Sequence, residues 1–276
     1  MGDYHRPRDL DEALKALTRP CTVLAGGTDF YPARVGRPVT EDVLDISGID
    51  ALRGISETAA GWRLGATTTW SELVEAELPP LFDGLKQAGR EVGGRQIQNA
   101  GTLAGNLCNA SPAADGVPAL LALDAEVEVV CSTGHRRVPL AGFITGVRRT
   151  VLQPGELVAA LHVPRPRHAA RAAFLKLGAR RYLVISIAMA SAVVESAEGK
   201  VQAARIAVGA CSPVAQRLPA LEAALVGAPL DRTLADRIDP AHLAPLSPID
   251  DVRGSAAYRR DAVLVLLRRL LQELVA

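Results

Sequence analysis

The sequence lacks any pair of closely spaced cysteines. It has only four in 276 residues, and none of them falls into a Cys-x-x-Cys spacing. The pattern excludes a self-contained zinc knuckle, a thioredoxin-like redox pair and a ligand run for an iron–sulfur cluster. In a chain of this length we interpret them as scattered, reduced thiols of a cytoplasmic protein. The four are Cys21, Cys108, Cys131 and Cys211.

Aromatic residues are also few, at 4% of the chain, and the net charge is only +1. These values argue against base-stacking platforms and against a field that attracts nucleic acid or an anionic membrane. The longest apolar run, from about Tyr182 to Val194, is interrupted by serines and is shorter than the roughly 20 residues that cross a bilayer. The first residues carry no apolar stretch of the signal-peptide type. We therefore expect a cytoplasmic protein with no membrane span and no nucleic-acid partner.

Length and apolar content point to two packed units. Hydrophobic residues make up 49% of the 276 residues, which is enough to bury a sizeable core, and the length exceeds that of one ordinary domain. The segment Pro164–Arg167 alternates proline and arginine, and its prolines stiffen the backbone and remove two donors. We predict one domain over residues 1–165 and a second over residues 170–276.

The first part of the chain has the pattern of a small α/β unit. Leu10, Leu14 and Leu17 fall on one helical stripe behind Asp9, a candidate N-cap. Two short apolar runs follow, and a long connection separates them, which suggests parallel pairing. The expected strands are residues 21–25 and 42–46.

Further along, the pattern alternates between strands and helices up to the proposed boundary. Beyond it, two long strands surround a turn, and two helices follow. The expected strands are residues 62–69, 125–130, 156–163, 184–195 and 201–210. One expected helix begins at Trp70. The other expected helices cover residues 80–90, 117–123, 218–226 and 255–275.

A glycine pair follows the first of the two short strands, in Leu24–Asp29. Two glycines there permit positive φ and a close approach of a ligand to the backbone. Successive N–H groups that point the same way form a nest for an anion, and Thr28 adds a hydroxyl donor. The segment can equally be only a tight turn. It is not a G-x-G-x-x-G fingerprint, so a Rossmann nicotinamide site is not indicated.

A second unusual stretch, residues 93–115, is rich in glycine, asparagine, alanine and serine and shows little periodicity. A loop of that length in a compact domain is typically functional or disordered, and its apolar residues argue against disorder. Its core, Gly101–Asn106, offers N–H and O–H donors to a polyanionic or sugar-bearing ligand. Asp115 precedes an apolar helix, so from the residues alone an N-cap is favoured over a carboxylate that accepts hydrogen bonds from ribityl or ribose hydroxyls.

Two donor-rich glycine segments about 75 residues apart suit a dinucleotide-like ligand better than either does alone. The usual hydrolytic alternative is missing, since there is no G-x-S-x-G elbow. The five histidines have no metal-ligand spacing. We therefore expect neither a metal site nor a catalytic side chain.

In order, the motifs of the chain resemble those of the FAD-binding (medium) subunit of the molybdenum hydroxylases, the family of xanthine dehydrogenase and aerobic carbon monoxide dehydrogenase. The resemblance covers essentially the whole chain, and five ordered motifs are more specific than one glycine loop. They are Ala25–Asp29, Gly65–Thr68, Gly101–Asn106 with Ser111, Pro112 and Asp115, then Lys176–Arg181, and finally Asp251–Arg260.

This resemblance implies an α+β fold. The first domain is expected to be of the vanillyl-alcohol-oxidase (PCMH) type, with two α+β subdomains and the flavin between them. The second is expected to contain a three-stranded antiparallel sheet and helices. The resemblance also implies that certain residues bind FAD. They are Leu24, Ala25, Gly26, Gly27, Thr28, Asp29, Phe30, Tyr31, Gly101, Thr102, Leu103, Ala104, Gly105, Asn106, Asp115, Val158, Lys176 and Ile185.

Two departures from the family pattern bear on the cofactor. Ala104 stands where the family often has glycine, which relaxes a close backbone approach there. The chain also lacks the cysteine-bearing insertion of the benzoyl-CoA reductase branch, so we predict FAD as the only cofactor.

The resemblance also implies partners. A large molybdopterin-binding subunit would oxidise the substrate, and a small subunit with two [2Fe–2S] clusters would pass electrons to FAD. Reduced flavin would deliver them to NAD, a quinone or oxygen. The expected assembly is a heterotrimer or a dimer of heterotrimers. A free-standing flavin-dependent oxidoreductase and a flavin-free scaffold protein remain as alternatives.

Overall fold

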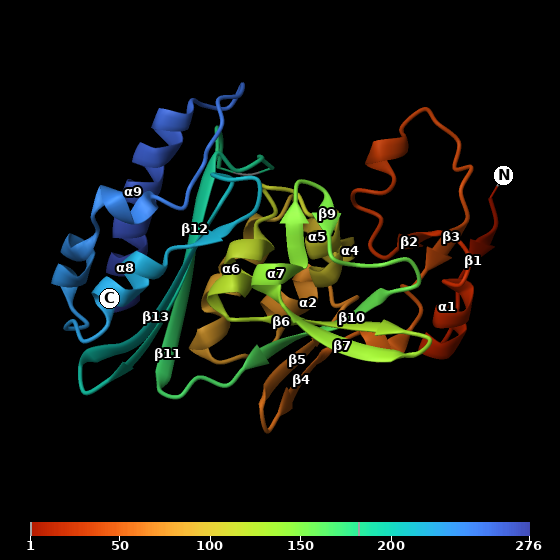
Figure 1. The fold of residues 1–276 in the computed structure, drawn as a ribbon, viewed down its shortest axis with the longest axis horizontal. Helices are drawn as coiled ribbons and strands as arrows, with labels where there is room; N and C mark the ends of the chain where they lie inside the picture. The colour runs from red at the N-terminus through yellow and green to blue at the C-terminus, as the bar shows by residue number, and fades with distance from the viewer. Residues whose placement is uncertain (1, 182) are drawn as a thin grey trace.

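The computed structural model describes residues 2–181 and 183–276. Tyr182, where the longest apolar run was expected to start, lies outside the described residues, as does Met1. Three units follow one another across the molecule (Figure 1). A small sheet near the N-terminus lies at one end, a larger antiparallel sheet with several helices occupies the middle, and a second antiparallel sheet with α8 and α9 forms the other end.

The N-terminal unit is a parallel three-stranded sheet with one helix. Its strand order is β1-β3-β2, and both pairings are parallel, which confirms the expected pairing. Asp9 caps the helix as predicted, because its carboxylate accepts a 2.8 Å hydrogen bond from the N–H of Glu12. The elements are β1 (Tyr4–His5), α1 (Leu10–Ala16), β2 (Thr22–Leu24), η1 (Pro32–Arg34), β3 (Val43–Asp45) and η2 (Asp50–Leu52).

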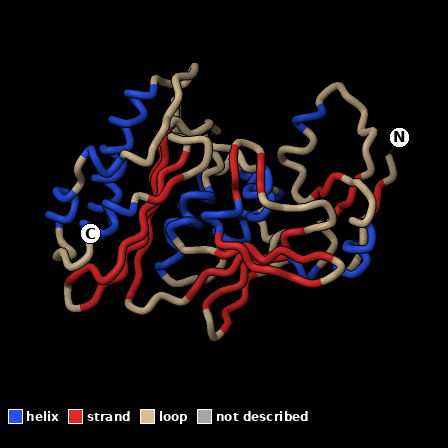
Figure 2. Tube along the Cα trace, viewed as in Figure 1, coloured by secondary structure: helices blue, strands red, loops and turns tan. Residues whose placement is uncertain are grey.

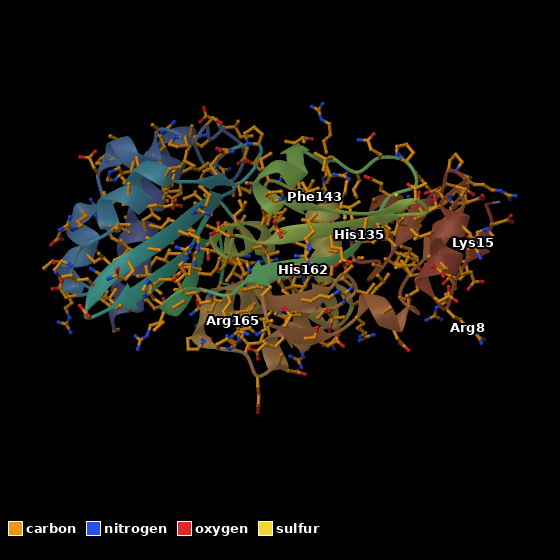
Figure 3. All side chains as sticks on the ribbon, turned by 60° about the horizontal axis from the view of Figure 1, so that its bottom comes forward. Arg8, Lys15, His135, Phe143, His162 and Arg165 are labelled. Atoms are coloured by element: carbon orange, nitrogen blue, oxygen red, sulfur yellow. The ribbon has the colours of Figure 1, made fainter. Side chains whose placement is uncertain are left out.

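The middle unit is built on a five-stranded antiparallel sheet of order β4-β5-β10-β6-β7. Its central strand is almost entirely buried, as expected for a strand covered on both faces. Beyond its end lies Arg165, which is labelled in Figure 3. Its guanidinium stacks on Trp62, with Cζ 4.9 Å from the ring centroid. The strands are β4 (Ile55–Thr58), β5 (Gly61–Gly65), β6 (Glu126–Cys131), β7 (Gly134–Pro139) and β10 (Leu157–Pro164).

The prediction of a long loop over residues 93–115 is wrong, because this stretch contains the helices α4 (Arg95–Ala100) and α5 (Leu103–Asn109). Helices this short show too little periodicity to be recognised in a sequence. Packing holds α5 in place, since Leu103 and Leu107 are fully buried. The other elements of this unit are α2 (Trp70–Glu75), η3 (Pro80–Phe82), α3 (Asp83–Glu91), α6 (Gly116–Ala122), α7 (Leu140–Phe143), β8 (Ile144–Gly146) and β9 (Arg149–Thr150).

The C-terminal unit has three long antiparallel strands, as expected, with the two-residue β14 added at one edge. The strand predicted from residue 184 begins only at Ala188, because the residues before it belong to the connection from β11. The elements are β11 (Ala169–Leu177), β12 (Ala188–Ala197), β13 (Lys200–Gly209), β14 (Gln216–Arg217), α8 (Pro219–Leu225), η4 (Arg232–Arg237), η5 (Pro240–Leu243) and α9 (Ala256–Val275).

This sheet lies between two layers of helices (Figure 2). The helices α3 and α6 of the middle unit pack on one face, where Met189 and Val193 join their core. On the other face α8 and α9 pack against Ala190 and Val194. Burial on both faces explains why β12 is an unbroken apolar run in the sequence. Among the described residues, no helix combines the length and the apolar character that a membrane crossing requires.

Candidate functional site

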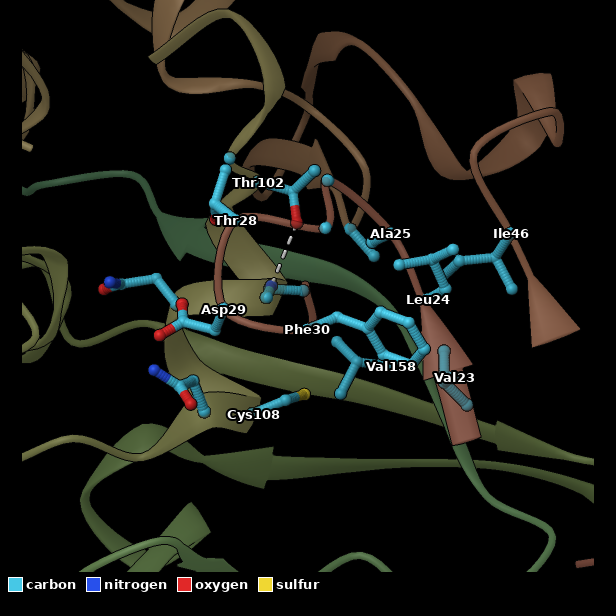
Figure 4. Close-up of a pocket in the computed structure, with 18 of the residues that line it drawn as sticks. Val23, Leu24, Ala25, Thr28, Asp29, Phe30, Ile46, Thr102, Cys108 and Val158 are labelled. Carbon is cyan, nitrogen blue, oxygen red and sulfur yellow. Dashed lines mark hydrogen bonds between the residues drawn. The ribbon is translucent and has the colours of Figure 1, made fainter. Parts of the chain in front are cut away.

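A pocket of about 610 Å³ lies where the loop after β2 meets the start of α5 and of β10. Figure 4 shows the loop Leu24–Phe30 curving around this space, with Thr102 and Cys108 from the α5 side. The pocket brings together 13 of the 18 residues expected to bind the cofactor. They are Leu24, Ala25, Gly26, Gly27, Thr28, Asp29, Phe30, Gly101, Thr102, Ala104, Gly105, Asn106 and Val158.

The remaining five expected residues do not line this pocket. Tyr31 and Ile185 are exposed at 61% and 62%, whereas Leu103 is buried in the core beneath α5. Asp115 and Lys176 are buried against each other at the junction with the C-terminal sheet. Their binding roles therefore stay predictions.

The loop after β2 presents unused backbone donors. Within the described chain, the N–H groups of residues 25–30 donate no hydrogen bond, and only the N–H of Tyr31 turns back, to the carbonyl oxygen of Gly27 at 3.2 Å. Gly27 has φ of +73°, a left-handed conformation that glycine adopts without strain. Consecutive free N–H groups beside a left-handed residue form the kind of concavity that binds an anion.

The second segment differs from the expectation that it is rich in free donors. The N–H groups of Leu103 and Ala104 already bond to the carbonyl oxygens of Thr68 and Ala66, at 3.0 and 3.2 Å. The N–H of Gly105 bonds to the Thr102 hydroxyl at 3.1 Å, the dashed line in Figure 4. These donors are used because they cap α5 and tie it to the strand end at β5. The segment therefore forms an uncharged wall of small residues.

One buried polar atom in this wall has no partner. Asn106 lines the pocket, and its side-chain oxygen is buried without a hydrogen bond among the described residues. It lies next to Gly116, where a Cβ would come within 2.9 Å of that oxygen and 2.5 Å of the Trp70 ring. An unpaired buried acceptor is costly in a native fold, but this oxygen has almost no accessible surface and is therefore out of reach of a ligand in the pocket.

Arg34 is the one basic residue among the described residues that line the pocket. Its guanidinium lies 3.8 Å from the centroid of the Phe30 ring, donates to the Phe30 carbonyl oxygen at 2.9 Å and pairs with Glu41. Hydrogen bonds from its own backbone and from Arg34 lower the pKa of Glu41, so that side chain is a carboxylate at neutral pH. Arg34 was not among the expected site residues, because an arginine after the glycine loop forms no recognisable motif.

Another part of the pocket lining is apolar apart from one carboxylate. Val23, Ile46 and Leu157 line it, a surface that suits a flat ring. The carboxylate is that of Glu156, which Arg136 holds by two hydrogen bonds of 2.9 and 2.8 Å. This bidentate pairing lowers the pKa of Glu156 and keeps it ionised.

The pocket contains no activated nucleophile among the described residues. Its one thiol belongs to Cys108, which is exposed and receives no hydrogen bond from a described residue that would stabilise a thiolate; desolvation by the surrounding protein raises the pKa of that thiol. It is therefore a neutral thiol near pH 7, which is a poor nucleophile. The geometry is suited to binding a ligand that has both an anionic part and an apolar part rather than to acid–base or covalent chemistry on a substrate.

Asp115 does not act as the helix cap favoured from the sequence alone. It stands at the N-cap position of α6, but its side chain makes no capping hydrogen bond. Its two oxygens bond instead to the Lys176 ammonium at 2.7 Å and to the Ser186 hydroxyl at 2.6 Å. Burial raises the pKa of Asp115, and these two partners oppose that shift. Ser186 was missed because a lone serine before a strand gives no signal in a sequence.

A cluster of three side chains of metal-ligating type lies apart from the pocket. Asp3, His5 and Asp42 bring their ligand atoms within 4.8 Å of one another, because β1 pairs with β3. None of these three side chains is buried, and exposed acidic groups of this kind commonly occur without a metal. We assign the cluster no role.

Comparison with known proteins agrees with this geometry. Residues 1–166 match the family described as the FAD binding domain in molybdopterin dehydrogenase. Residues 173–274 match the family described as the CO dehydrogenase flavoprotein C-terminal domain. Together these two matches cover nearly the whole chain.

Individual relatives and solved structures extend the similarity. The chain is 29% identical to the xanthine dehydrogenase FAD-binding subunit of Escherichia coli O157:H7, over 100% of this chain and 97% of that protein. It is 32% identical to the carbon monoxide dehydrogenase medium chain of Afipia carboxidovorans, over 98% and 95%. Its fold superposes on a crystal structure of Cu,Mo-CO dehydrogenase with a TM-score of 0.90 at 29% identity, covering 99% of this chain and 97% of that one. For quinoline 2-oxidoreductase from Pseudomonas putida 86 the TM-score is also 0.90, at 25% identity over 100% and 97%.

Fold and site together define a flavoprotein with FAD as its cofactor. The chain belongs to the FAD-binding medium subunits of the molybdenum hydroxylases, an oxidoreductase family. The resemblance seen in the sequence is thereby confirmed, as are the α+β fold class and the cofactor.

Proposed function

We propose that this chain is the electron-transfer subunit of a cytoplasmic molybdenum hydroxylase complex. Its partners are a large molybdopterin-binding subunit and a small subunit with two [2Fe–2S] clusters, in a heterotrimer or a dimer of heterotrimers. Electrons pass from the clusters of the small subunit, with FAD bound in this chain as carrier, to NAD, a quinone or oxygen. FAD supplies the ability to couple one-electron and two-electron steps.

One observation carries the proposal: six consecutive free N–H groups, of residues 25–30, and the guanidinium of Arg34 belong to the same pocket. This arrangement suits the pyrophosphate of a dinucleotide, because the two phosphates carry negative charge and accept hydrogen bonds. The apolar lining around Val158 suits a planar ring. The small-residue wall of Gly101–Asn106 leaves room for the length between them.

Within this assignment the residues of the chain bind and orient rather than react. Glu156 is held in its ion pair with Arg136, and Cys108 stays a neutral thiol. No proton needs to move at either group. Tyr31, Leu103, Asp115, Lys176 and Ile185 remain proposed cofactor residues, and the division into domains of residues 1–165 and 170–276 also remains a proposal.

The proposal is tested on the complex assembled from this chain and its two proposed partners. We expect one FAD per copy of this chain. We also expect anaerobic addition of the complex's substrate, sought among carbon monoxide, purines and aldehydes, to bleach the flavin absorbance. Omitting the iron–sulfur subunit should abolish the bleaching while leaving FAD bound. If the purified chain instead turns over a substrate alone, the free-standing oxidoreductase is correct. Adding NAD, a quinone or oxygen to the reduced complex identifies the acceptor.

A further inference from the structure

The hairpin of β8 and β9 lies outside the pocket but holds one of the residues that line it. The two strands are joined by a two-residue turn, Val147–Arg148. From this turn, Nη1 of Arg148 donates to both oxygens of Asn109, the last residue of α5. It reaches the backbone oxygen at 3.2 Å and also the side-chain oxygen. Asn109 lines the pocket, whereas Arg148 does not.

Two residues in this contact adopt a backbone conformation that residues other than glycine rarely take. Arg148 has φ of +58°, and Ala110, which follows Asn109, has φ of +46°. The N–H of Arg148 donates to the carbonyl oxygen of Ala110 at 2.9 Å, so the two left-handed residues are bonded to each other. A glycine would adopt this conformation without strain, so the turn itself gives no reason for an arginine at position 148. Strained backbone that the surrounding structure maintains is often found at ligand sites.

The contact fixes the orientation of the Asn109 amide. A guanidinium has donors and no acceptor, so the atom of the amide that faces Arg148 is its oxygen. The amide nitrogen therefore points away from Arg148, and within the described chain it donates no hydrogen bond. A positive charge at the oxygen also polarises the amide and strengthens its two N–H donors. Asn109 thus presents two unused donors from the lining of the pocket.

These donors belong to the same pocket as the free N–H groups of residues 25–30. Figure 4 shows Cys108, the neighbour of Asn109, on the α5 side of the space around which the loop with Asp29 and Phe30 curves. An anionic oxygen is the acceptor that suits both sets of donors, because N–H bonds to charged acceptors are the stronger ones. In a bound dinucleotide the phosphate groups carry such oxygens.

We propose that Arg148 is a positioning residue for the phosphate groups of the cofactor: it holds the Asn109 amide so that its N–H groups point into the pocket and donate to a phosphate oxygen. This inference rests on the proposed function, since the ligand it concerns is bound FAD. Asn109 then touches the ligand, and Arg148 acts through Asn109 without touching it. Neither residue was expected from the sequence, because 39 positions separate them and only the fold brings them together.

The test compares Arg148→Gly, Asn109→Ala and the double variant in the full chain. Glycine keeps the left-handed turn, so Arg148→Gly removes the guanidinium without disturbing the hairpin, and the unfolding midpoint should not fall. We expect the FAD dissociation constant to rise about tenfold in Asn109→Ala, since a hydrogen bond to a charged group is lost. Arg148→Gly should raise it about fivefold, and the double variant should bind FAD no more weakly than Asn109→Ala alone.

Three comparisons distinguish positioning from a general effect of charge or folding. Arg149→Ala removes the charge of an exposed neighbour that also does not line the pocket, and it should leave FAD affinity unchanged. Arg148→Lys keeps a cationic donor and should retain most of the affinity. Adenosine, used as a competitor, shares its base and ribose with FAD but has no phosphate, so its inhibition constant should be the same in all variants.

The outcomes separate this inference from the proposed function. If Arg148→Gly binds FAD as tightly as the unaltered chain, or if its loss adds in full to that of Asn109→Ala, the inference is wrong. Equal weakening of FAD and adenosine, or equal losses in Arg148→Gly and Arg149→Ala, would also contradict it. If Arg148→Gly does not fold, Arg148→Asn replaces it, because asparagine also adopts the left-handed conformation, and unchanged affinity there contradicts the inference. If the unaltered chain binds no FAD, the proposed function itself fails.

Discussion

Gly26 lies directly against the carbonyl oxygen of Ala100. A Cβ at Gly26 would overlap that oxygen and would lie 3.0 Å from the Cα of Gly101. The loop after β2 and the turn before α5 therefore dock backbone against backbone, across about 75 residues of sequence. No side chain separates them at this contact, and both segments line the pocket that begins beside it.

Gly26→Ala should disrupt both the contact and the cofactor site. The obstacle is backbone, which cannot rotate away, so we expect a loss of about 1–3 kcal/mol in the free energy of unfolding and no bound FAD after purification. Gly142→Ala is the control, since a Cβ there meets nothing within 4 Å. Urea unfolding and the flavin absorbance of the purified protein provide the measurements. A Gly26→Ala protein with normal flavin content would show that the two segments need not touch.

Arg34 and Glu41 should affect FAD affinity in opposite directions. Arg34→Gln removes a cation from the pocket, and we expect the FAD dissociation constant to rise about tenfold and to depend less on salt. Glu41→Gln removes the anion that pairs with Arg34, so affinity should increase a few-fold. Flavin fluorescence titrations at two salt concentrations measure both effects. Weaker binding by both variants to the same extent would mean that the pair only holds the loop together.

Thr102 should stabilise the pocket wall through its cap on α5. Thr102→Ala leaves the N–H of Gly105 without its 3.1 Å hydrogen bond, which costs about 1 kcal/mol for an N-cap. Thr102→Ser keeps the hydroxyl and should retain most of that stability. Urea unfolding measures the free energy of unfolding of the unaltered protein and of both variants. An equal loss of that free energy in Thr102→Ala and Thr102→Ser would contradict a capping role.

Asp251 should make the free energy of unfolding depend on pH in the acidic range. Hydrogen bonds from Arg253 lower the pKa of Asp251 from 3.8 to about 2, and its carboxylate also pairs with the buried Arg259 at 2.6 Å. A lowered pKa in the folded state means that the stabilisation is complete above about pH 4 and is lost as the pH falls towards 2. Asp251→Asn should therefore be less stable at neutral pH and should lose less on acidification.

Thermal unfolding of both proteins between pH 6 and pH 2 provides the measurement. Asp11→Asn, at an exposed position of α1, serves as the control. Parallel curves for the unaltered protein and Asp251→Asn would exclude this contribution.

The sequence was sufficient to predict elements with a strong period. The stripe Val263, Leu267, Leu270 and Leu274 predicted α9, and all four side chains are buried. The glycine segments predicted the pocket, because Gly26 and Gly27 are needed where a backbone contact or a positive φ occurs. In each case the signal in the sequence, a repeated apolar spacing or a pair of glycines, lies within a short stretch of the chain.

Features that depend on distant contacts were not predictable. The helices α4 and α5 are short and are held by packing and by carbonyl groups from the β5 end. Arg34 lines the pocket because the turn after the glycine loop carries it onto Phe30, and Ser186 meets Asp115 only because the fold joins residues 71 positions apart. Asp115 as a cap was the better local interpretation, and Lys176, 61 residues away, overrides it.

A crystal structure of the chain with FAD tests the central claim most directly. The account predicts that the pyrophosphate oxygens lie within hydrogen-bonding distance, about 2.7–3.2 Å, of N–H groups in the loop Ala25–Phe30, with the cofactor extending past Gly101–Asn106. FAD seated elsewhere, or a pyrophosphate that makes no hydrogen bond to this loop, would contradict it.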